Sequence, residues 1–506
     1  MSEKILKHVP LNILTNIILF LINIVVNLYM TPFYIKYLGI DGYGVLRLGL
    51  MLPVYISLIT LVISSSVSRF LIISLQKDDV ENSNSIFNTA FISMTLMLII
   101  IFPIIIYFSY NVGDFLDIPT QYISKSKYMF LGIFTSSQIT VFAALFMIPA
   151  YANNRLDIIN FTKISIILLQ SSIIIFLFSQ VSASIDTIGL IYVLVSLLGL
   201  GVSILVWKKY ANILVIRISK FNLKMFKKMT SMGGWVLVNQ LGSLLFLSID
   251  LLIINHYFGP KETGMYSIVL QWSVLLRSLA GMVASVLGPL ILISYANEKF
   301  DDIVNYTKFS MKFLGIMIAI PIGLIMGFAS PLLSLWVGVE YVELKELLWL
   351  IVGPLVINLA VLPLFSVNTA FNKVKIPALL SILFGIVNFG LAILLSVNFE
   401  LKLYGIALAS AIVLTVKNTI FIPIYSAYIL GLKKNYFLVQ LIPGFLMLLT
   451  VLFFSFTVEM MTKLNTWLEF LCYTFLVLLL SLISIWFFFL SNNDKKIISD
   501  KLLKRF

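Results

Sequence analysis

The sequence predicts an all-α membrane protein with about fourteen transmembrane helices. Of its 506 residues, 60% are hydrophobic and only 11% are charged, whereas a soluble domain carries about 25% charged residues. The apolar runs are long and continuous, which indicates helices and not the alternating strands of a membrane barrel. Lys and Arg are also divided unequally between the loops. These observations leave no room for a sizeable soluble domain.

The apolar runs define fourteen spans, each near the roughly 20 residues that cross the hydrocarbon core. In order they cover 12–34, 44–74, 86–110, 126–152, 158–180, 186–207, 231–257, 264–293, 306–330, 344–370, 376–397, 403–429, 437–458 and 465–490. With the N-terminus inside, 25 of the 35 Lys and Arg fall in cytoplasmic segments and eight in outside segments. Because positive residues concentrate in cytoplasmic loops, this division predicts that both termini are cytoplasmic.

The first helices of the chain recur near its middle. The turns after the first and seventh spans share a pattern at an offset of 220 residues, with Tyr37, Gly39 and Gly44 matching Tyr257, Gly259 and Gly264. Two further matches follow in the same order, Asn153 with Asn372 and Gly189 with Gly405. Glycines allow tight turns and close helix contacts. The repeat predicts two six-helix lobes in the same orientation, followed by two extra helices.

The repeat and the charge pattern define the predicted organisation of the chain. It comprises an N-terminal lobe (1–207), a basic cytoplasmic linker (208–230), a C-terminal lobe (231–430), two additional transmembrane helices (431–490) and a basic tail (491–506). In the linker, apolar residues recur every four positions between lysines. This pattern is typical of an interfacial helix on anionic headgroups.

Several ionisable residues lie inside predicted spans, where a charge costs about 2.5–3.5 kcal/mol on insertion scales. Arg277 is the main candidate for a phosphate or headgroup ligand, because a guanidinium binds phosphate oxygens in pairs. Lys417 and Arg47 are further candidates, although Lys417 could extend to the interface and Arg47 could be an interfacial anchor. Asp250 is a candidate for ion coupling, or for a structural ion pair with Arg277.

A polar stripe follows one face of the first span. It consists of Asn12, Asn16, Asn23 and Asn27. At about 100° per residue these four fall within an arc of roughly 60°. The seventh span repeats the first three intervals with Asn239, Ser243 and Asp250. We expect these residues to line a cavity, the alternative being hydrogen bonds between helices.

Other functional classes find no support in the sequence. There is no phosphate-binding GxxxxGK[ST] motif and no Ser/His/Asp or paired-carboxylate arrangement, so we expect no enzyme activity and no catalytic residue. One cysteine and two histidines predict neither a metal site nor a cofactor. The net charge of +13 follows from the cytoplasmic loops and does not indicate nucleic acid.

The repeated turns, the arrangement of six, six and two spans, and the basic linker resemble the polysaccharide-biosynthesis flippases. These are the Wzx-type O-antigen and capsule repeat-unit translocases of the multidrug/oligosaccharidyl-lipid/polysaccharide exporter superfamily. The resemblance covers essentially the whole chain. It implies two lobes around a central cavity in the bacterial cytoplasmic membrane. The implied substrate is an undecaprenyl-pyrophosphate-linked oligosaccharide, moved from the inner to the outer leaflet by alternating access.

The resemblance also implies partners and leaves alternatives open. The partners are membrane lipids, a polysaccharide polymerase and a chain-length regulator, with H⁺ or Na⁺ as the coupling ion in the absence of an ATP motif. The alternatives are a multidrug/cation antiporter of the same superfamily and a peptidoglycan lipid-precursor flippase. A non-transporting membrane scaffold is a third, against which the charges inside the spans argue.

Overall fold

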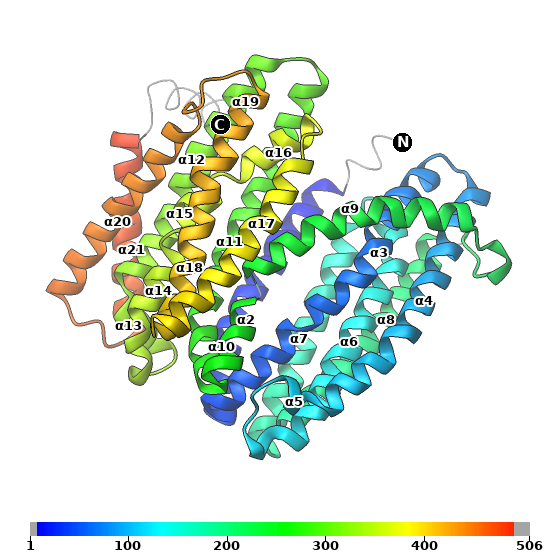
Figure 1. Ribbon diagram of the computed structural model, residues 1–506, viewed down its shortest axis with the longest axis horizontal. Helices are drawn as coiled ribbons and strands as arrows, with labels where there is room; N and C mark the ends of the chain where they lie inside the picture. The colour runs from blue at the N-terminus through cyan, green and yellow to red at the C-terminus, as the bar shows by residue number, and fades with distance from the viewer. Residues whose placement is uncertain (1–7, 212, 248, 490–506) are drawn as a thin grey trace. The chain divides into compact units, whose positions relative to one another are not determined.

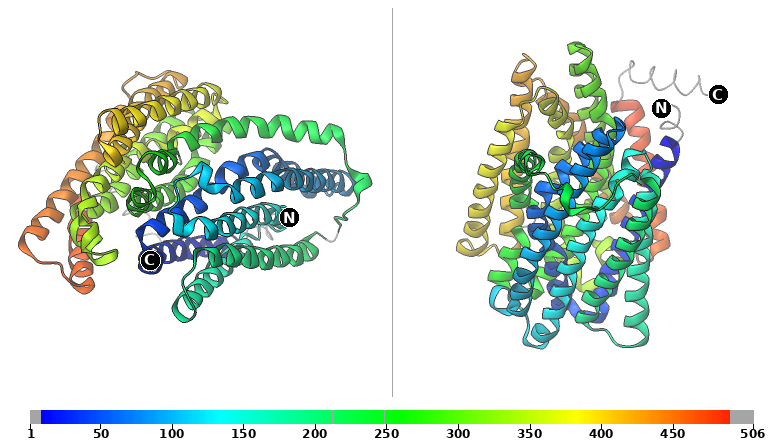
Figure 2. Two further views of the ribbon diagram at one scale, coloured as in Figure 1. Left: turned by 60° about the horizontal axis from the view of Figure 1, so that its bottom comes forward. Right: turned by 90° about the vertical axis from the view of Figure 1, so that its right-hand side faces the viewer.

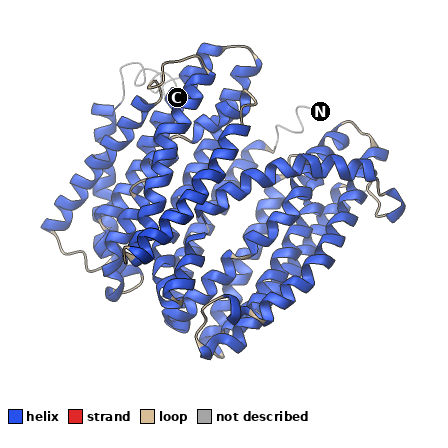
Figure 3. Ribbon diagram, in the orientation of Figure 1, coloured by secondary structure: helices blue, strands red, loops and turns tan. Residues whose placement is uncertain are grey.

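The computed structural model describes residues 8–211, 213–247 and 249–489. This part of the chain consists of helices and short loops and contains no strand (Figure 3). It divides into two compact units, Met1–Gly264 and Met265–Phe506. Within each unit the long helices run side by side (Figure 2), as expected where every backbone group must be satisfied inside its own helix.

Twelve of the described helices are long and apolar enough to cross a membrane, which confirms the all-α membrane class. The predicted number of fourteen is not confirmed. The first of the twelve stretches, Pro10–Leu58, continues from the first predicted span into the second. The remainder of the second span and the end of the seventh appear as shorter apolar helices, Thr60–Gln76 and Ile249–Phe258.

The helices of the first unit follow one another with short connections, except before α9, where residues 211–222 intervene (Figure 1). They are α2 (Val9–Met51), α3 (Pro53–Gln76), α4 (Val80–Tyr110), α5 (Val112–Phe115), α6 (Thr120–Ala152), α7 (Leu156–Gln180), α8 (Ile185–Tyr210), α9 (Leu223–Leu247) and α10 (Ile249–Phe258). Helices α6 and α8 meet at two glycines: a Cβ atom on Gly132 would lie 2.4 Å from the backbone of Gly189. Only glycine permits this separation, so Gly189 serves helix packing.

Helix α2 changes direction at Gly39. This residue has φ 68° and ψ 174°, a conformation that interrupts the helical path and that is essentially restricted to glycine. The chain before Gly39 and the chain from Ile40 to Met51 therefore run as two separate helical segments. The bend brings residues that are far apart along α2 to the same part of the unit.

The segment between α8 and α9 is held by two asparagines one turn apart on α4. The amide of Asn84 donates to the carbonyl oxygen of Ile213 and accepts from the N–H of Val215. Asn88 makes the same pair of bonds to Val215 and Arg217. Each side-chain amide thus bonds to the backbone of this segment as a neighbouring β-strand would. These bonds anchor the predicted interfacial linker to the first unit.

The second unit continues from α11 (Pro260–Ala296), which begins in the first. Its other helices are α12 (Phe300–Gly327), α13 (Ala329–Trp336), α14 (Lys345–Val352), α15 (Leu355–Ala360), α16 (Leu362–Ala370), α17 (Lys375–Ile393), α18 (Lys402–Val416), α19 (Ile422–Ile429), α20 (Ile442–Met461) and α21 (Trp467–Ser484). Three π-helical turns, Leu394–Asn398, Lys417–Phe421 and Ile485–Phe489, follow α17, α18 and α21. Turns of this kind are rare in proteins, and those that occur are often found at functional sites.

Backbone conformations recur along the chain at the spacing of the predicted repeat. Six of the ten described residues with positive φ form three pairs that lie 218 to 220 positions apart, Gly39 with Gly259, Asp78 with Glu298 and Asn154 with Asn372. The last two pairs end their helices in the same way. After each positive-φ residue, the N–H of the next residue donates to the carbonyl oxygen five positions before it: Asp79 to Ser74, Lys299 to Ser294, Arg155 to Ala150 and Lys373 to Asn368. These matched helix ends support the internal repeat.

Candidate functional site

A cavity of about 210 Å³ lies inside the first unit, between α2, α7 and α8. Both segments of α2 line it, with Asn23 and Asn27 before the bend and Arg47 after it. In a straight helix, Asn23 and Arg47 would be about 36 Å apart at 1.5 Å per residue. The conformation of Gly39 is therefore what brings these three predicted site residues to one cavity.

The remaining polar lining of this cavity was not predicted from the sequence. It includes Gln170 of α7, Tyr192 of α8, and Tyr34 and Tyr43 on either side of the bend in α2. Gln170 and Ser171, with Ser172, interrupt the apolar stretch from Ile166 to Phe178, which is the signal that could have identified them. The tyrosines give no such signal, because they also suit the membrane interface.

Arg47 supplies the charge of the cavity. Its Nε atom is buried and has no hydrogen-bond partner among the described residues, and none of the residues that line the cavity is an Asp or a Glu. The hydroxyl of Tyr43 is buried and likewise has no partner in the described part of the chain. Arg47 as a whole is half-buried, and a cation held partly out of water gains from an anionic partner. The cavity is thus suited to an anionic group that also accepts hydrogen bonds.

The two asparagines on the wall of the cavity are arranged along α2 by bonds within that helix. Asn23 donates to the carbonyl oxygen of Leu19 at 2.8 Å, and Asn27 donates to that of Asn23 at 2.7 Å. Thr31 continues the series by donating to Asn27 at 3.0 Å. Each amide is thereby held in one orientation by its own helix.

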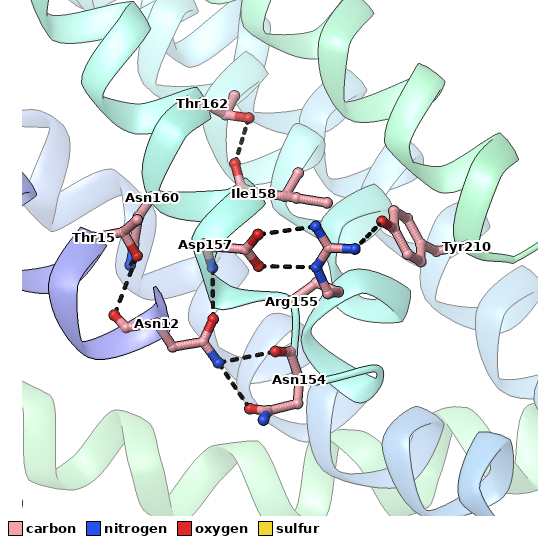
Figure 4. A network of polar contacts seen from close by, with 9 residues as sticks. All are labelled: Asn12, Thr15, Asn154, Arg155, Asp157, Ile158, Asn160, Thr162 and Tyr210. Atoms are coloured by element: carbon pink, nitrogen blue, oxygen red, sulfur yellow. Dashed lines mark hydrogen bonds and ion pairs between the residues drawn. The ribbon is translucent and has the colours of Figure 1, made fainter. Parts of the chain in front are cut away.

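Asn12 and Asn16, the other half of the predicted stripe, contact the start of α7 (Figure 4 shows Asn12). The Asn12 amide donates to the backbone oxygen of Asn154 at 2.9 Å and accepts from the N–H of Asp157 at 2.9 Å. Asn160 donates to Asn16 Oδ1 at 2.9 Å. These bonds between helices match the alternative that the sequence left open, and they fix the beginning of α2.

The same corner contains an ion pair that the sequence did not indicate (Figure 4). Arg155 and Asp157 are joined by two hydrogen bonds of 3.0 and 2.9 Å, and Arg155 also donates to the Tyr210 hydroxyl at 2.8 Å. The bond to Asp157 raises the pKa of the Arg155 guanidinium, which lies just before the spanning part of α7. The network joins α7 and α8 at one end of the unit.

Lys417 and Arg277 lie in the second unit. Lys417 is only 7% exposed, and its ammonium donates to Ser381 of α17 at 2.7 Å. Its neighbour Asn418 donates to Asn358 at 3.0 Å, so the π-helical turn carries a buried polar cluster. Arg277 is partly buried on α11, and its Nε atom donates to Ser273 at 3.2 Å, one turn earlier.

The other residues predicted for the C-terminal half are placed less completely. Asp250 is buried, at 6% exposure, at the start of α10 in the first unit. Asn239 and Ser243 belong to α9, and their side chains lie outside the described residues. Of the ten predicted site residues, Asn23, Asn27 and Arg47 are thus the three that line a single described cavity.

Two curated proteins are similar to this chain over most of its length, and no family model matches it. The uncharacterized membrane protein EpsK of Bacillus subtilis (strain 168) is 32% identical over 466 residues, 90% of each chain. A putative O-antigen transporter of Shigella flexneri is 25% identical over 356 residues, 69% of this chain and 81% of that protein.

Solved structures share the fold. The lipid II flippase MurJ in an inward closed conformation has a TM-score of 0.64 at 16% identity, covering 94% of this chain and 99% of MurJ. An inward-facing multidrug resistance MATE family transporter of the MOP superfamily also has a TM-score of 0.64, at 14% identity, covering 85% and 95%. Identities this low establish the shared all-helical architecture alone.

Proposed function

The chain belongs to the polysaccharide-biosynthesis flippase family of the multidrug/oligosaccharidyl-lipid/polysaccharide exporter superfamily, and we propose that it translocates a lipid-linked oligosaccharide. The proposed substrate is an undecaprenyl-pyrophosphate-linked repeat unit of an O-antigen, capsule or exopolysaccharide. It would move from the inner to the outer leaflet of the bacterial cytoplasmic membrane, in a protein whose two termini are both cytoplasmic. A polysaccharide polymerase and a chain-length regulator would then use the exported unit.

The observation that carries this proposal is the cavity around Arg47. A glycan attached through pyrophosphate presents negative charge beside many hydroxyl groups, and an unsatisfied polar group in hydrocarbon costs several kcal/mol. The cavity offers a guanidinium for the phosphate and the amides of Asn23, Asn27 and Gln170 for hydroxyl groups. Amides both donate and accept, which suits sugar hydroxyls that do the same.

The same cavity separates the proposal from its closest alternative. A cavity that selects cationic drugs needs negative charge, whereas the described lining here carries Arg47 and no carboxylate. A peptidoglycan-precursor flippase would handle a similar anionic lipid, so the two flippase functions differ in the glycan and not in the charge of the headgroup.

We assign Arg277 and Lys417 to headgroup binding and Asp250 to coupling with an inward H⁺ or Na⁺ gradient. All three are ionisable groups inside predicted spans, which mark ion and substrate pathways in transporters. Arg277→Ala is expected to weaken headgroup binding. Asp250→Asn is expected to lower the gradient-driven rate while leaving binding intact, and an unchanged ion dependence of transport in this variant would remove Asp250 from the coupling mechanism.

The proposal is tested with the purified full chain in proteoliposomes containing a fluorescent polyprenyl-pyrophosphate oligosaccharide. The measurement is the rate at which the labelled sugar becomes accessible to an external quencher. We expect Arg47→Gln to lower this rate at least about tenfold, because a charge-assisted contact contributes about 1.5–3 kcal/mol. Lys36→Gln removes an exposed cation from the same helix and should leave the rate within about twofold.

The opposite results are equally informative. A chain that leaves the labelled lipid in its original leaflet but extrudes an organic cation such as ethidium would be a multidrug antiporter, and the flippase proposal would be wrong. Equal rates for the Arg47 and Lys36 variants would remove the Arg47 cavity from the transport path. Movement of a lipid-linked muropeptide at a higher rate than any polysaccharide repeat would instead assign the chain to peptidoglycan synthesis.

A further inference from the structure

Two apolar cavities lie along the pair of helices α7 and α8, apart from the Arg47 cavity. One, of about 250 Å³, is also bordered by α3 and α6, and the other, of about 300 Å³, lies between α7 and α8 alone. They share Thr162, Ile166 and Gly199 as lining residues. The two cavities are therefore parts of one groove, which we call the α7–α8 groove.

Seven described residues along the α7–α8 groove carry hydroxyl groups, and four of these hydroxyls donate to the backbone of their own helices at 2.9 Å or less. Thr140 donates to Ser136, Thr162 to Ile158, Ser196 to Val193 and Ser203 to Gly199, each through a backbone carbonyl oxygen at 2.8 or 2.9 Å. Such bonds use the hydroxyl protons, so these four groups have no donor left for a polar ligand. The groove therefore presents a surface suited to hydrocarbon.

The outer part of the groove is open on the exterior of the first unit. Phe161 of α7 is 51% exposed, and Leu198 and Val202 of α8 are 58% and 42% exposed. Both helices are apolar enough to span a membrane. Exposed apolar side chains on a spanning helix contact hydrocarbon chains, so a lipid chain can enter the groove from the membrane without crossing a polar barrier.

The groove adjoins the Arg47 cavity along the same two helices. Ile166 and Leu169 line the groove, whereas Ile167 and Gln170 line the Arg47 cavity. On α8, Tyr192 belongs to the cavity and Val195 to the groove. Consecutive residues of a helix point about 100° apart, so the cationic, amide-lined site and the apolar groove lie on two different faces of α7 at the same level along it. On α8 their lining residues are three positions apart.

We propose that the α7–α8 groove holds the isoprenoid chain of the transported lipid while Arg47 contacts its phosphate. This inference rests on the proposed function, which supplies an amphiphilic substrate whose chain must remain in hydrocarbon. The arrangement matches the two ends of that substrate, with positive charge and amides for the head and apolar walls for the chain. Lys163 is the one charged residue in the described lining of the groove.

Photocrosslinking of the full chain in lipid nanodiscs tests the site. The probe is a polyprenyl phosphate with a diazirine in the isoprene units next to the phosphate, and labelled peptides are identified by mass spectrometry. We expect labels in 158–169 of α7 and 195–206 of α8, and competition by unlabelled polyprenyl phosphate. A phosphatidylglycerol with a diazirine in its acyl chain serves as the second probe.

Two glycines of α8 provide a matched pair of variants. Gly199 is buried where the two parts of the groove meet, and a Cβ atom there would lie 2.8 Å from Ile166 Cδ1. Gly201 is exposed, and a Cβ atom on it would have no heavy atom within 4 Å. Gly199→Phe should reduce isoprenoid labelling at least about tenfold, and Gly201→Phe should not change it by more than about twofold. Val202 is partly exposed in the groove, and Val202→Trp is the alternative groove-filling variant if the Gly199→Phe protein does not fold.

The outcomes separate this inference from the proposed function. Labels on the α7–α8 groove without any movement of the lipid-linked sugar would keep the groove and contradict the flippase proposal. Movement of the sugar with isoprenoid labels confined to other helices would contradict the groove and keep the flippase. Equal labelling of the groove by the acyl probe, or labelling insensitive to both groove-filling variants, would also overturn it.

Discussion

Gly44 and Gly264 each contact the backbone that precedes the other. A Cβ atom on Gly44 would lie 2.0 Å from the carbonyl oxygen of Pro260, and one on Gly264 would lie 2.4 Å from that of Ile40. Ile40 and Pro260 stand at the same offset of 220 residues as the two glycines, so one contact is made twice. Reciprocal contacts of this kind characterise two-fold related interfaces, and all four residues belong to the first unit.

Gly264→Ala is expected to destabilise the protein, because the methyl group must displace backbone atoms that cannot move independently. Overpacking of this kind costs about 1–3 kcal/mol, and thermal unfolding of the purified chain in detergent measures it. Gly281→Ala on the same helix is the control, since a Cβ atom there would have nothing within 4 Å. That control should gain stability from helix propensity, and equal unfolding temperatures for the two variants would contradict the contact.

Gly39→Ala is expected to disturb both stability and transport. The backbone at Gly39, with φ 68° and ψ 174°, costs about 1–3 kcal/mol for any other residue. Relief of that strain would straighten α2 and separate Arg47 from Asn27 in the cavity. We therefore expect a lower unfolding temperature together with a several-fold lower rate of lipid movement in the proteoliposome assay.

The control for the bend is Gly113→Ala, where a Cβ would meet Ile123 at 3.8 Å, an ordinary van der Waals distance. It should leave both the unfolding temperature and the rate nearly unchanged. If Gly39→Ala unfolded with a lower free energy but transported at the normal rate, the bend would matter for folding alone, and the Arg47 cavity would not depend on it.

Asp157→Asn is expected to weaken the corner of the first unit that joins α2, α7 and α8. The Asp157 side chain is only 4% exposed and accepts two hydrogen bonds from Arg155. Hydrogen bonds to charged groups contribute about 1.5–3 kcal/mol, so the free energy of unfolding should fall by about that amount. Chemical denaturation monitored by tryptophan fluorescence provides the measurement.

An exposed ion pair in the same unit serves as the comparison. Lys220 and Glu81 are 3.9 Å apart with side chains 41% and 89% exposed, and such pairs contribute about 0–1 kcal/mol. Glu81→Gln should therefore have a smaller effect, and 1 M salt should remove it. A loss at Asp157→Asn no larger than at Glu81→Gln would show that the Arg155 pair does not stabilise the unit.

The sequence was sufficient for features that depend on local chemistry. Continuous apolar runs predicted the helical membrane class, and the glycines at 39, 44, 259 and 264 predicted the repeated turns, because positive φ and close backbone contacts favour glycine. The helix ends at Asp78 and Glu298 add a matched pair that the sequence comparison had not identified. The chain's backbone therefore preserves a symmetry that its residues show only in part.

The site itself depended on tertiary structure. Helical periodicity places Asn12, Asn16, Asn23 and Asn27 on one face, but it does not say which neighbour each residue meets. The first two contact the start of α7, and the last two line the cavity. Arg47 joins the latter pair only because α2 bends at Gly39, and Gln170 and Tyr192 come from separate helices.

Ser381→Ala and Lys417→Met are expected to be energetically coupled. The Lys417 ammonium is 7% exposed and donates to Ser381 at 2.7 Å, while the Ser381 hydroxyl donates to its own helix at Pro377. Removal of the hydroxyl takes an acceptor from a buried cation, so Ser381→Ala should be costly in the natural chain and nearly neutral when Lys417→Met is also present. Contacting residues show coupling energies of about 0.5–3 kcal/mol in double-mutant cycles, and chemical denaturation of the four proteins gives this value.

Ser481→Ala is the matched control for this cycle. Ser481 is also buried but donates to Val477 of its own helix, and its effect should add to that of Lys417→Met within about 0.5 kcal/mol. If Ser381→Ala were also additive, Ser381 would not hold the ammonium in place. Transport by the same variants then separates the two roles of Lys417. If Lys417 serves folding alone, the transport rate per folded molecule stays unchanged in Lys417→Met. If Lys417 binds the headgroup, the rate falls in Lys417→Met but not in Lys417→Arg.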